Sequence, residues 1–336
     1  MLNKLGVPAI RLYSRNGINP IKERQVSERA MHLEQVDRSK IVVVLPAYNE
    51  ERFIGSTVIK TRQYADTVIV VDDGSIDDTA EIAQTAGAIV VSHSHNMGKG
   101  VALSTGFGKA LELNPTVIVT LDGDGQHVPQ EMTFVVAPIL RGEADIVVGS
   151  RYLENRSKVP THRILGHWVF TSLTNIFSGV SITDSQSGFR AFSPKALQSI
   201  SFSSNGFSVE SEMQFLAREH HLRMAEVPIT IHYKDKPKRS VVGQGLIVLD
   251  GVLRFTGQYR PLLFFGLPGL ALLLVGVIWG VWVVEIYRDN HVLAVGYAMI
   301  CMLLAILGSL ILFTGFTLHS VRELLVNTLG SREAKR

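Results

Sequence analysis

Two long stretches near the carboxyl end of this 336-residue chain contain no charged residue: Leu262 to Val284 and Val292 to Leu318. Each is longer than the roughly 20 apolar residues that a helix needs to cross the core of a bilayer. Residues 285–291, which separate them, are too few to form a domain. The sequence therefore predicts a two-helix transmembrane hairpin over residues 261–320, in preference to two core helices of a soluble protein.

Positive charges lie mainly on one side of this hairpin. Arg254 and Arg260 precede the first stretch, and the tail of residues 321–336 contains four more Arg or Lys residues. The loop between the stretches contains one, Arg288. Because cytoplasmic flanks carry the excess of Arg and Lys, we expect an integral membrane protein whose large amino-terminal part and both termini are cytoplasmic.

Composition excludes several classes of protein. The formal net charge of +3 argues against a broad nucleic-acid-binding surface. Cys301 is the only cysteine, so an intrachain disulfide is impossible. Residues 1–40 lack the apolar segment of a secretory signal. We expect residues 1–38, which are basic and show no clear periodicity, to form a mobile or membrane-surface extension, with Met31 as an alternative start.

Between this extension and the hairpin, apolar runs alternate with amphipathic stretches. The expected strands are residues 41–45, 67–71, 88–92, 116–121 and 144–149, and the expected helices are residues 51–65, 77–86, 99–113 and 129–141. Such alternation predicts an α/β domain over residues 39–240, with a Rossmann-like, mostly parallel sheet. Ligands of these sheets bind beyond the carboxyl ends of the strands.

Polar side chains follow several of these strands directly. Asp122 and Asp124, with glycines between and after them, come after the fourth strand, and both carboxylates can reach one Mg²⁺ or Mn²⁺. An isolated turn of this kind usually binds nothing, but the first strand ends at Pro46, the second at Asp72 and the fifth before Arg151. An apolar wall, carboxylates, a divalent cation and arginine together suit a nucleotide diphosphate.

Other nucleotide and metal motifs are missing from the sequence. The segment from Gly98 to Leu103 lacks the third glycine of the dinucleotide fingerprint, and no P-loop occurs. The histidines have neither cysteine partners nor HExxH spacing, so we expect them at surfaces or interfaces rather than on zinc.

Six motifs in order, VVVLPAYNEE, VIVVDDGSIDDT, NMGKG, VTLDGDGQHVP, IVVGSRY and DSQSGFRAFS, resemble those of family 2 glycosyltransferases of the GT-A fold. Within that family the chain is similar to the dolichyl-phosphate mannose synthase group, which glycosylates polyprenyl phosphates. The resemblance covers roughly residues 40–240 and extends to the membrane hairpin that some members contain.

The resemblance implies a role for each strand-end residue. Residues implied to contact the nucleotide sugar are Pro46, Tyr48, Glu50, Asp72, Asp73, Lys99 and Asp122. Residues implied to hold Mg²⁺ or Mn²⁺ are Asp122, Asp124 and Gln126. Residues implied to act in catalysis, by facing phosphates or by orienting, are Asp122, Asp124, Arg151, Arg190 and Asp184. For Lys99, a solvated loop charge is an equal alternative.

The segment before the hairpin suits an anionic lipid acceptor. Lys238, Arg239 and Ser240 resemble the family's basic acceptor loop, and we expect them, with Arg151 and Arg190, to contact the acceptor phosphate. The alternative is a juxtamembrane anchor to anionic lipids. Residues 241–260, which include an amphipathic segment, and residues 162–180 are expected to lie at the headgroup level, although residues 162–180 could instead pack on the α/β core.

The expected reaction is inverting transfer of a sugar from a nucleotide sugar to a polyprenyl phosphate. The acceptor phosphate, with a second pKa of about 6, is already largely ionised, so no general base is required. A processive polysaccharide synthase is disfavoured because its Gln-x-x-Arg-Trp motif is absent; a non-catalytic scaffold and a sugar-1-phosphate nucleotidyltransferase are further alternatives. GDP-mannose, UDP-glucose and UDP-N-acetylglucosamine remain open as donors, and dolichol and undecaprenol as lipids. Glycines of the spans (Gly266, Gly269, Gly276, Gly280) permit a homo-oligomer.

Overall fold

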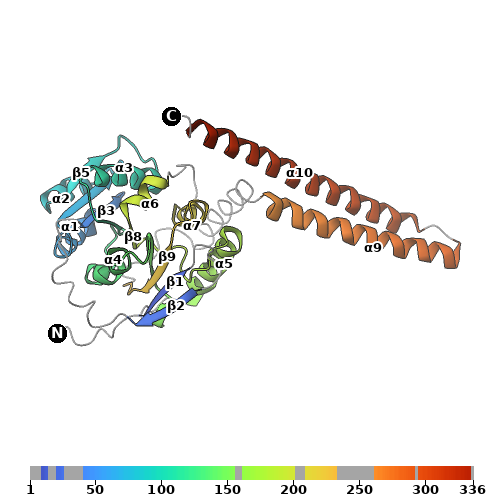
Figure 1. The fold of residues 1–336 in the computed structure, drawn as a ribbon, viewed down its shortest axis with the longest axis horizontal. Helices are drawn as coiled ribbons and strands as arrows, with labels where there is room; N and C mark the ends of the chain where they lie inside the picture. Colours follow the sequence, from blue (N-terminus) through green and yellow to red (C-terminus); the bar gives the residue numbers. More distant parts are fainter. Residues whose placement is uncertain are drawn as a thin grey trace. The chain divides into compact units, whose positions relative to one another are not determined.

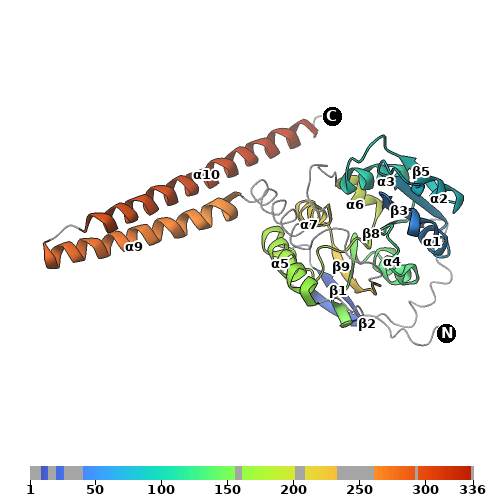
Figure 2. The same cartoon turned by 180° about the vertical axis from the view of Figure 1, so that it is seen from behind.

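The computed structural model describes residues 9–13, 20–25, 41–155, 161–200, 209–232, 261–291 and 294–333. The chain divides into two compact units, Met1–Leu249 and Asp250–Arg336. The first unit contains a layered α/β domain and the second a helical hairpin (Figures 1 and 2).

Nine strands among the described residues form one sheet in the order β2-β1-β9-β7-β8-β6-β3-β4-β5. They are β1 (Ala9–Tyr13), β2 (Pro20–Gln25), β3 (Ile41–Ala47), β4 (Thr67–Asp72), β5 (Ile89–Ser92), β6 (Val117–Thr120), β7 (Ile146–Ser150), β8 (Arg190–Phe192) and β9 (Met224–Pro228). The pairings make every one of these strands except β1 and β8 point the same way. The predicted mostly parallel α/β fold is confirmed, and the five expected strands lie within two residues of their predicted ends.

Helices cover both faces of the sheet (Figures 1 and 2). They are α1 (Glu51–Thr61), α2 (Thr79–Thr85), α3 (Lys99–Glu112), α4 (Met132–Leu140), α5 (Thr161–Ser178), α6 (Pro194–Ser199) and α7 (Val209–Glu219), with 3₁₀ turns η4 (Pro129–Glu131) and η5 (Leu153–Asn155). Because successive strand side chains point to opposite faces, Val43 and Leu45 pack with α1, α2 and α4, whereas Val42 and Val44 pack with α3, α6 and α7. The strands end between these two apolar layers, which leaves the sheet's carboxyl edge for polar residues.

The amino-terminal segment differs from its prediction. We expected residues 1–38 to lie outside the fold, but β1 and β2 extend the sheet, and β1 pairs antiparallel with β9 through Arg11 and Leu12. Ile10 and Tyr13 are buried and pack on opposite faces of the sheet. The expectation of a mobile extension is therefore wrong for residues 9–13 and 20–25. The strand was not predicted because two buried side chains in five residues form too short a pattern to be recognised within a basic segment.

In the second unit, the π-helical turn η6 (Leu262–Gly266) leads into α9 (Leu267–Asn290), which pairs with α10 (Val295–Glu333). Two helices among the described residues, Leu262–Asp289 and Val295–Leu324, are long and apolar enough to cross a membrane. They agree with the predicted spans, although α10 continues into the predicted tail.

Glycines bring the backbones of α9 and α10 together. A Cβ on Gly269 would lie 2.5 Å from the Leu312 nitrogen, and one on Gly276 would lie 2.7 Å from the Ala305 nitrogen. From the other helix, a Cβ on Gly308 would lie 2.4 Å from the Leu273 nitrogen. Small residues permit such close approach of membrane helices. Two of the glycines expected to allow oligomers, Gly269 and Gly276, thus serve the pairing of helices within one chain.

Candidate functional site

The predicted strand-end residues meet at one edge of the sheet because β6, β3 and β4 are parallel neighbours. Asn49 joins the loop after β3 to the loop after β4 through two hydrogen bonds. The Asn49 amide donates to the Ser75 hydroxyl at 2.9 Å, and the Ile76 amide donates to the Asn49 side-chain oxygen at 3.0 Å. Asn49 has a positive φ of 54°, which turns the chain from β3 into α1. The motifs that are separate in the sequence therefore lie together at the carboxyl edge of the sheet. We call the loops that follow β3, β4 and β6 at this edge the rim.

Asp72 and Asp73 are buried and hold loops in place. The carboxylate of Asp73 accepts from the amides of Met97 at 2.9 Å and Gly98 at 2.8 Å, and it contacts His93 Nδ1 at 2.8 Å. Asp72 accepts from the Ser75 amide at 3.1 Å. Of the residues expected at the nucleoside, Tyr48 is 44% exposed. The two aspartates therefore shape the rim, while Tyr48 presents a ring to solvent.

The Asp122–Asp124 turn concentrates negative charge at this rim. Burial raises the pKa of Asp124, and the nearby charges of Asp122 and Glu50 raise it further. Burial would also raise the pKa of Asp122, but Lys99 and then His127 reverse the effect and lower it strongly. The charge of Asp122 thus acts on Asp124, and both carboxylates lie at the same edge of the sheet.

The donor set of this turn fits Mg²⁺ or Mn²⁺. Asp122, Asp124 and Gln126 offer two carboxylates and an amide oxygen, which are hard ligands suited to these ions. Among the residues described here, no group of three or more His, Cys, Asp or Glu side chains is arranged to hold a metal alone. In a site of the Mg²⁺ kind, one or two carboxylates share the ion with substrate phosphates.

Gly188, in the Ser-Gly-Phe motif, lies directly against the Asp122 carboxylate. A Cβ on Gly188 would lie 2.5 Å from Asp122 Oδ2 and 2.7 Å from Oδ1. The Thr120 hydroxyl donates to the Gly188 carbonyl at 2.8 Å and fixes this backbone. Only a glycine therefore leaves space for the Asp122 carboxylate.

Lys99 and Glu210 form an ion pair that joins α3 to α7. Lys99 Nζ lies 2.6 Å from Glu210 Oε1 and 2.6 Å from Asp122 Oδ1. The sequence analysis missed Glu210. Glu210 and Glu212 are the acids in the first turn of α7, but no sequence pattern links either of them to Lys99.

Arg151 is fixed by Asp184. Arg151 Nε and Nη2 donate to the two Asp184 oxygens at 2.6 Å each, and the Arg151 amide donates to Oδ2 at 3.0 Å. Burial would raise the pKa of Asp184, but Arg151 lowers it. Behind this pair, Glu226 accepts from the amides of Thr183 at 2.8 Å and Asp184 at 3.2 Å, and from the Tyr13 hydroxyl. The sequence analysis missed Glu226 and Tyr13.

Arg190 is fully buried, contrary to the expectation that it faces a phosphate. Its Nε donates to the Ser187 carbonyl at 2.9 Å and its Nη2 to the Ser185 carbonyl at 2.8 Å. Burial lowers the pKa of Arg190 to about 10, although Glu210 and Asp184 oppose the shift. Because its hydrogen bonds go to the turn before β8, Arg190 braces that turn. Lys238, Arg239, Ser240 and residues 241–260 lie outside the described residues.

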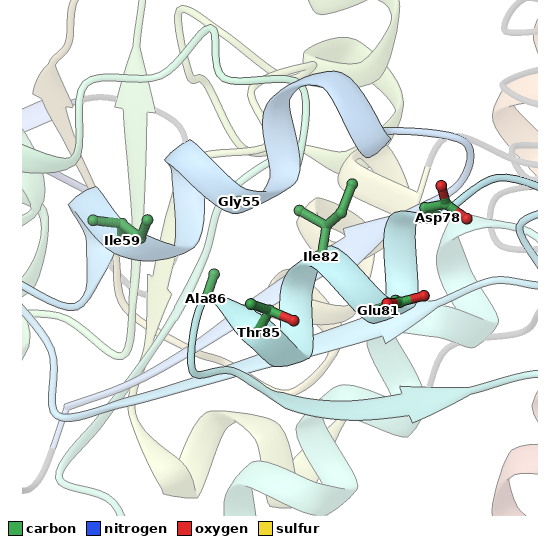
Figure 3. A pocket seen from close by; sticks show the side chains of 7 residues that line it. All are labelled: Gly55, Ile59, Asp78, Glu81, Ile82, Thr85 and Ala86. Atoms are coloured by element: carbon green, nitrogen blue, oxygen red, sulfur yellow. The ribbon is translucent and has the colours of Figure 1, made fainter.

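A separate pocket of about 340 Å³ lies between α1 and α2 (Figure 3). Its lining residues are Gly55, Ile59, Asp78, Glu81, Ile82, Thr85 and Ala86. A Cβ on Gly55 would lie 2.9 Å from Ile82 Cγ2, so Gly55 permits the close helix packing around this pocket. None of the strand-end residues lines it, and we assign the site to the sheet edge.

The sheet and the carboxylates at its carboxyl edge define an α/β protein, a class in which ligands bind beyond the carboxyl ends of the strands. Residues 42–201 match the model of the family "Glycosyl transferase family 2". MJ1222 of Methanocaldococcus jannaschii is 40% identical over 209 residues, which cover 60% of this chain and 86% of that protein. The chain belongs to glycosyl transferase family 2 and is a glycosyltransferase.

Two further proteins show how far the likeness extends. The UDP-N-acetylglucosamine–dolichyl-phosphate N-acetylglucosaminyltransferase of Methanococcus voltae is 34% identical over 218 residues, or 58% of this chain and 86% of that protein. Glucosyl-3-phosphoglycerate synthase of Mycobacterium tuberculosis, solved with Mn²⁺, UDP-glucose and phosphoglyceric acid, has a TM-score of 0.51 and 23% identity over 67% of this chain and 84% of that one. The second likeness shows the fold alone.

Proposed function

We propose that this glycosyltransferase moves a sugar from a nucleotide sugar to a polyprenyl phosphate, with inversion at the anomeric carbon. The observation that carries the proposal is the position of two carboxylates, Asp122 and Asp124, directly after β6 at the carboxyl edge of the sheet. The relative from Methanococcus voltae, whose name states a dolichyl-phosphate acceptor, supports the acceptor class.

The donor side uses the rim described above. Asp122, Asp124 and Gln126 would hold Mg²⁺ or Mn²⁺, which when bound neutralises charge on the leaving diphosphate. Tyr48 and Glu50 contact the nucleoside, and Asp72 and Asp73 fix the loops around it. We favour a UDP-sugar over GDP-mannose because the name of the Methanococcus voltae relative states UDP-N-acetylglucosamine.

The acceptor side requires binding rather than proton transfer. A phosphate monoester with a second pKa of about 6 is already a nucleophile near neutral pH. Arg151, held rigidly by Asp184, contacts a phosphate, and Lys238, Arg239 and Ser240 contact the acceptor phosphate. Direct attack on the anomeric carbon then inverts its configuration.

The exposed face of α5 supports a site beside a membrane. Thr171, Thr174 and Ser178 are buried, whereas Trp168 and Ile176 are 65% and 64% exposed. An amphipathic helix with an exposed Trp suits the headgroup region. With the two apolar helices of the second unit, this face favours a membrane protein. The excess of Arg and Lys on the flanks of the hairpin, against Arg288 alone in its loop, favours a cytoplasmic catalytic unit and cytoplasmic termini.

The full chain in vesicles that contain polyprenyl phosphate provides the test. We expect labelled UDP-glucose, UDP-N-acetylglucosamine or GDP-mannose to yield a glycosylated lipid with Mg²⁺ or Mn²⁺ and not with a chelator. Asp124→Asn should reduce transfer at least about a hundredfold, as loss of a group that stabilises developing charge does. Asp66→Asn, an exposed carboxylate before β4, is the matched control and should retain activity. Wild-type turnover by Asp124→Asn would exclude the metal assignment.

A second experiment separates donor from acceptor binding. Replacing Lys238 and Arg239 by Gln should raise the apparent KM for the lipid more than that for the nucleotide sugar, because these cations contact the acceptor phosphate. Equal changes in both constants would speak against the acceptor role. A folded protein that binds no nucleotide with any metal would instead favour the scaffold alternative.

A further inference from the structure

Lys99 contacts a carboxylate that the proposed function assigns to a metal ion. Its ammonium lies 2.6 Å from Asp122 Oδ1, and His127 Nε2 lies 3.4 Å from Oδ2 of the same carboxylate. Both oxygens of Asp122 therefore face a positively charged group or a ring nitrogen. A divalent ion that uses Asp122 must share or replace these contacts.

The second partner of Lys99 comes from a different element. Glu210, in the first turn of α7, lies 2.6 Å from the same ammonium and is 8% exposed. Burial would raise the pKa of Glu210, but Lys99 lowers it. Lys99 can therefore leave Asp122 and remain paired with a charged carboxylate.

The backbone at Lys99 is fixed, whereas its side chain has space. The Asp73 carboxylate holds the amides of Met97 and Gly98, and Gly98 has a φ of +94°, so the start of α3 is set by the loop. The Lys99 side chain is 38% exposed. Movement at this position is thus confined to the side chain.

We propose that Lys99 and the divalent ion are alternative partners of Asp122. Lys99 neutralises Asp122 when no ion is bound, and it shifts toward Glu210 when the ion binds. Glu210 is a positioning residue that keeps the displaced ammonium at the rim, beside the diphosphate. This inference rests on the proposed metal site at Asp122 and Asp124.

Metal binding without nucleotide tests the exchange directly. In Lys99→Met, Mn²⁺ no longer competes with a cation, so its Kd, measured by electron paramagnetic resonance on the full chain, should fall at least about tenfold, or about 1.4 kcal/mol. Lys109→Met is the control, because Lys109 lies on the same helix and pairs with Glu112 at 2.6 Å. Its Mn²⁺ affinity should equal that of the wild type.

Glu210→Gln provides a second variant with the opposite sign, and it retains the Lys99–Asp122 pair. With its alternative partner neutralised, Lys99 should hold Asp122 more tightly, and Mn²⁺ should bind roughly tenfold more weakly. In the Lys99→Met background the same substitution should have a smaller effect, since no lysine remains to be displaced.

The outcomes separate this inference from the proposed function. If wild-type protein and all variants fail to bind Mn²⁺ even when UDP is present, the proposed metal site is wrong. If Mn²⁺ binds the wild type but equally well or more weakly in Lys99→Met, the metal site stands and the exchange is overturned. An unchanged affinity in Glu210→Gln also overturns it.

Discussion

The two halves of the sheet position their polar residues in different ways. In the half formed by β6, β3, β4 and β5, carboxylates at strand ends accept hydrogen bonds from backbone amides of nearby loops, as Asp72 does from Ser75 and Asp73 from Gly98. All pairings among these strands are parallel. The loops after these strands are therefore held by hydrogen bonds from backbone amides to carboxylates.

In the half formed by β7, β8, β9 and β1, strand directions are mixed and charges are buried. Asp184, Arg190 and Glu226 are fully buried, and Arg151 nearly so. Arg190 donates to carbonyls three and five residues before it, but Arg151 and Asp184 are 33 residues apart and Tyr13 and Glu226 are 213 residues apart. The comparison teaches that the half with the proposed donor site is fixed by hydrogen bonds from loop amides to carboxylates, whereas the other half depends mainly on buried charged side chains.

Breaking the Arg151–Asp184 pair should give the largest loss of stability. Asp184→Asn leaves a buried guanidinium without its countercharge, which costs about 3–5 kcal/mol. For a domain of this size the midpoint of thermal unfolding should fall by about 10 °C. Asp72→Asn, which weakens one hydrogen bond in the other half, should cost only about 1 kcal/mol. Equal losses in the two variants would contradict the contrast between the halves.

Gly188 lies where the two halves meet, and its replacement should give the second-largest effect, a loss of transfer activity. In Gly188→Ala the new Cβ displaces the Asp122 carboxylate, because the Gly188 backbone is fixed by Thr120. Transfer should fall roughly tenfold to a hundredfold, as displacement of a positioned group does. Gly108→Ala is the control, since a Cβ there meets nothing within 4 Å. Unchanged turnover in Gly188→Ala would show that the position of Asp122 in one half does not depend on the Gly188 backbone in the other.

Tyr13→Phe tests whether the amino-terminal strand supports the buried charges. Burial raises the pKa of Glu226, and the Tyr13 hydroxyl donates to its carboxylate. Loss of that donor should cost about 1–3 kcal/mol, measured by thermal unfolding of the full chain. Tyr64→Phe, whose ring packs against the core of the other half, is the matched control. A loss no larger than that of the control would remove Tyr13 from the network.

The donor half was legible in the sequence because its signals are local. An apolar run followed by Asp72 or Asp122 identifies both a strand and its end, and parallel topology then brings such ends together. The same reasoning could not find Glu210, which reaches the rim from α7, because a helix position far along the chain carries no mark of its partner. The spatial pairing with Lys99 exists only in the folded protein.

The second half was less legible for a related reason. Arg190 follows a glycine-containing motif and looked like a phosphate ligand, but in β8 it is buried and braces the preceding turn. Tyr13 lies in a short strand whose place in the sheet is set by β9. The roles of Arg190 and Tyr13 depend on contacts that form only in the folded protein, and the periodicity of the sequence does not encode those contacts.

The smallest effect is expected at the more exposed pair before β7. Asp145 accepts from Arg223 Nε at 3.0 Å and from its Nη2 at 2.9 Å, and the Arg223 side chain is 36% exposed. Such pairs contribute about 0–1 kcal/mol, so Asp145→Asn should lower the unfolding midpoint by at most a few degrees at neutral pH. Burial would raise the pKa of Asp145, but Arg223 lowers it below 3.8.

The sign of this shift fixes how that small effect depends on pH. Because the folded-state pKa lies below the unfolded value of 3.8, the stabilisation is present above that pH and is lost as the pH falls through the folded-state pKa. Wild-type and Asp145→Asn melting curves should therefore differ at neutral pH and converge in acid. A fall in the unfolding midpoint as large as that of Asp184→Asn, or one that persists in acid, would contradict this prediction. It would show that exposure does not distinguish the Asp145–Arg223 pair from the Arg151–Asp184 pair.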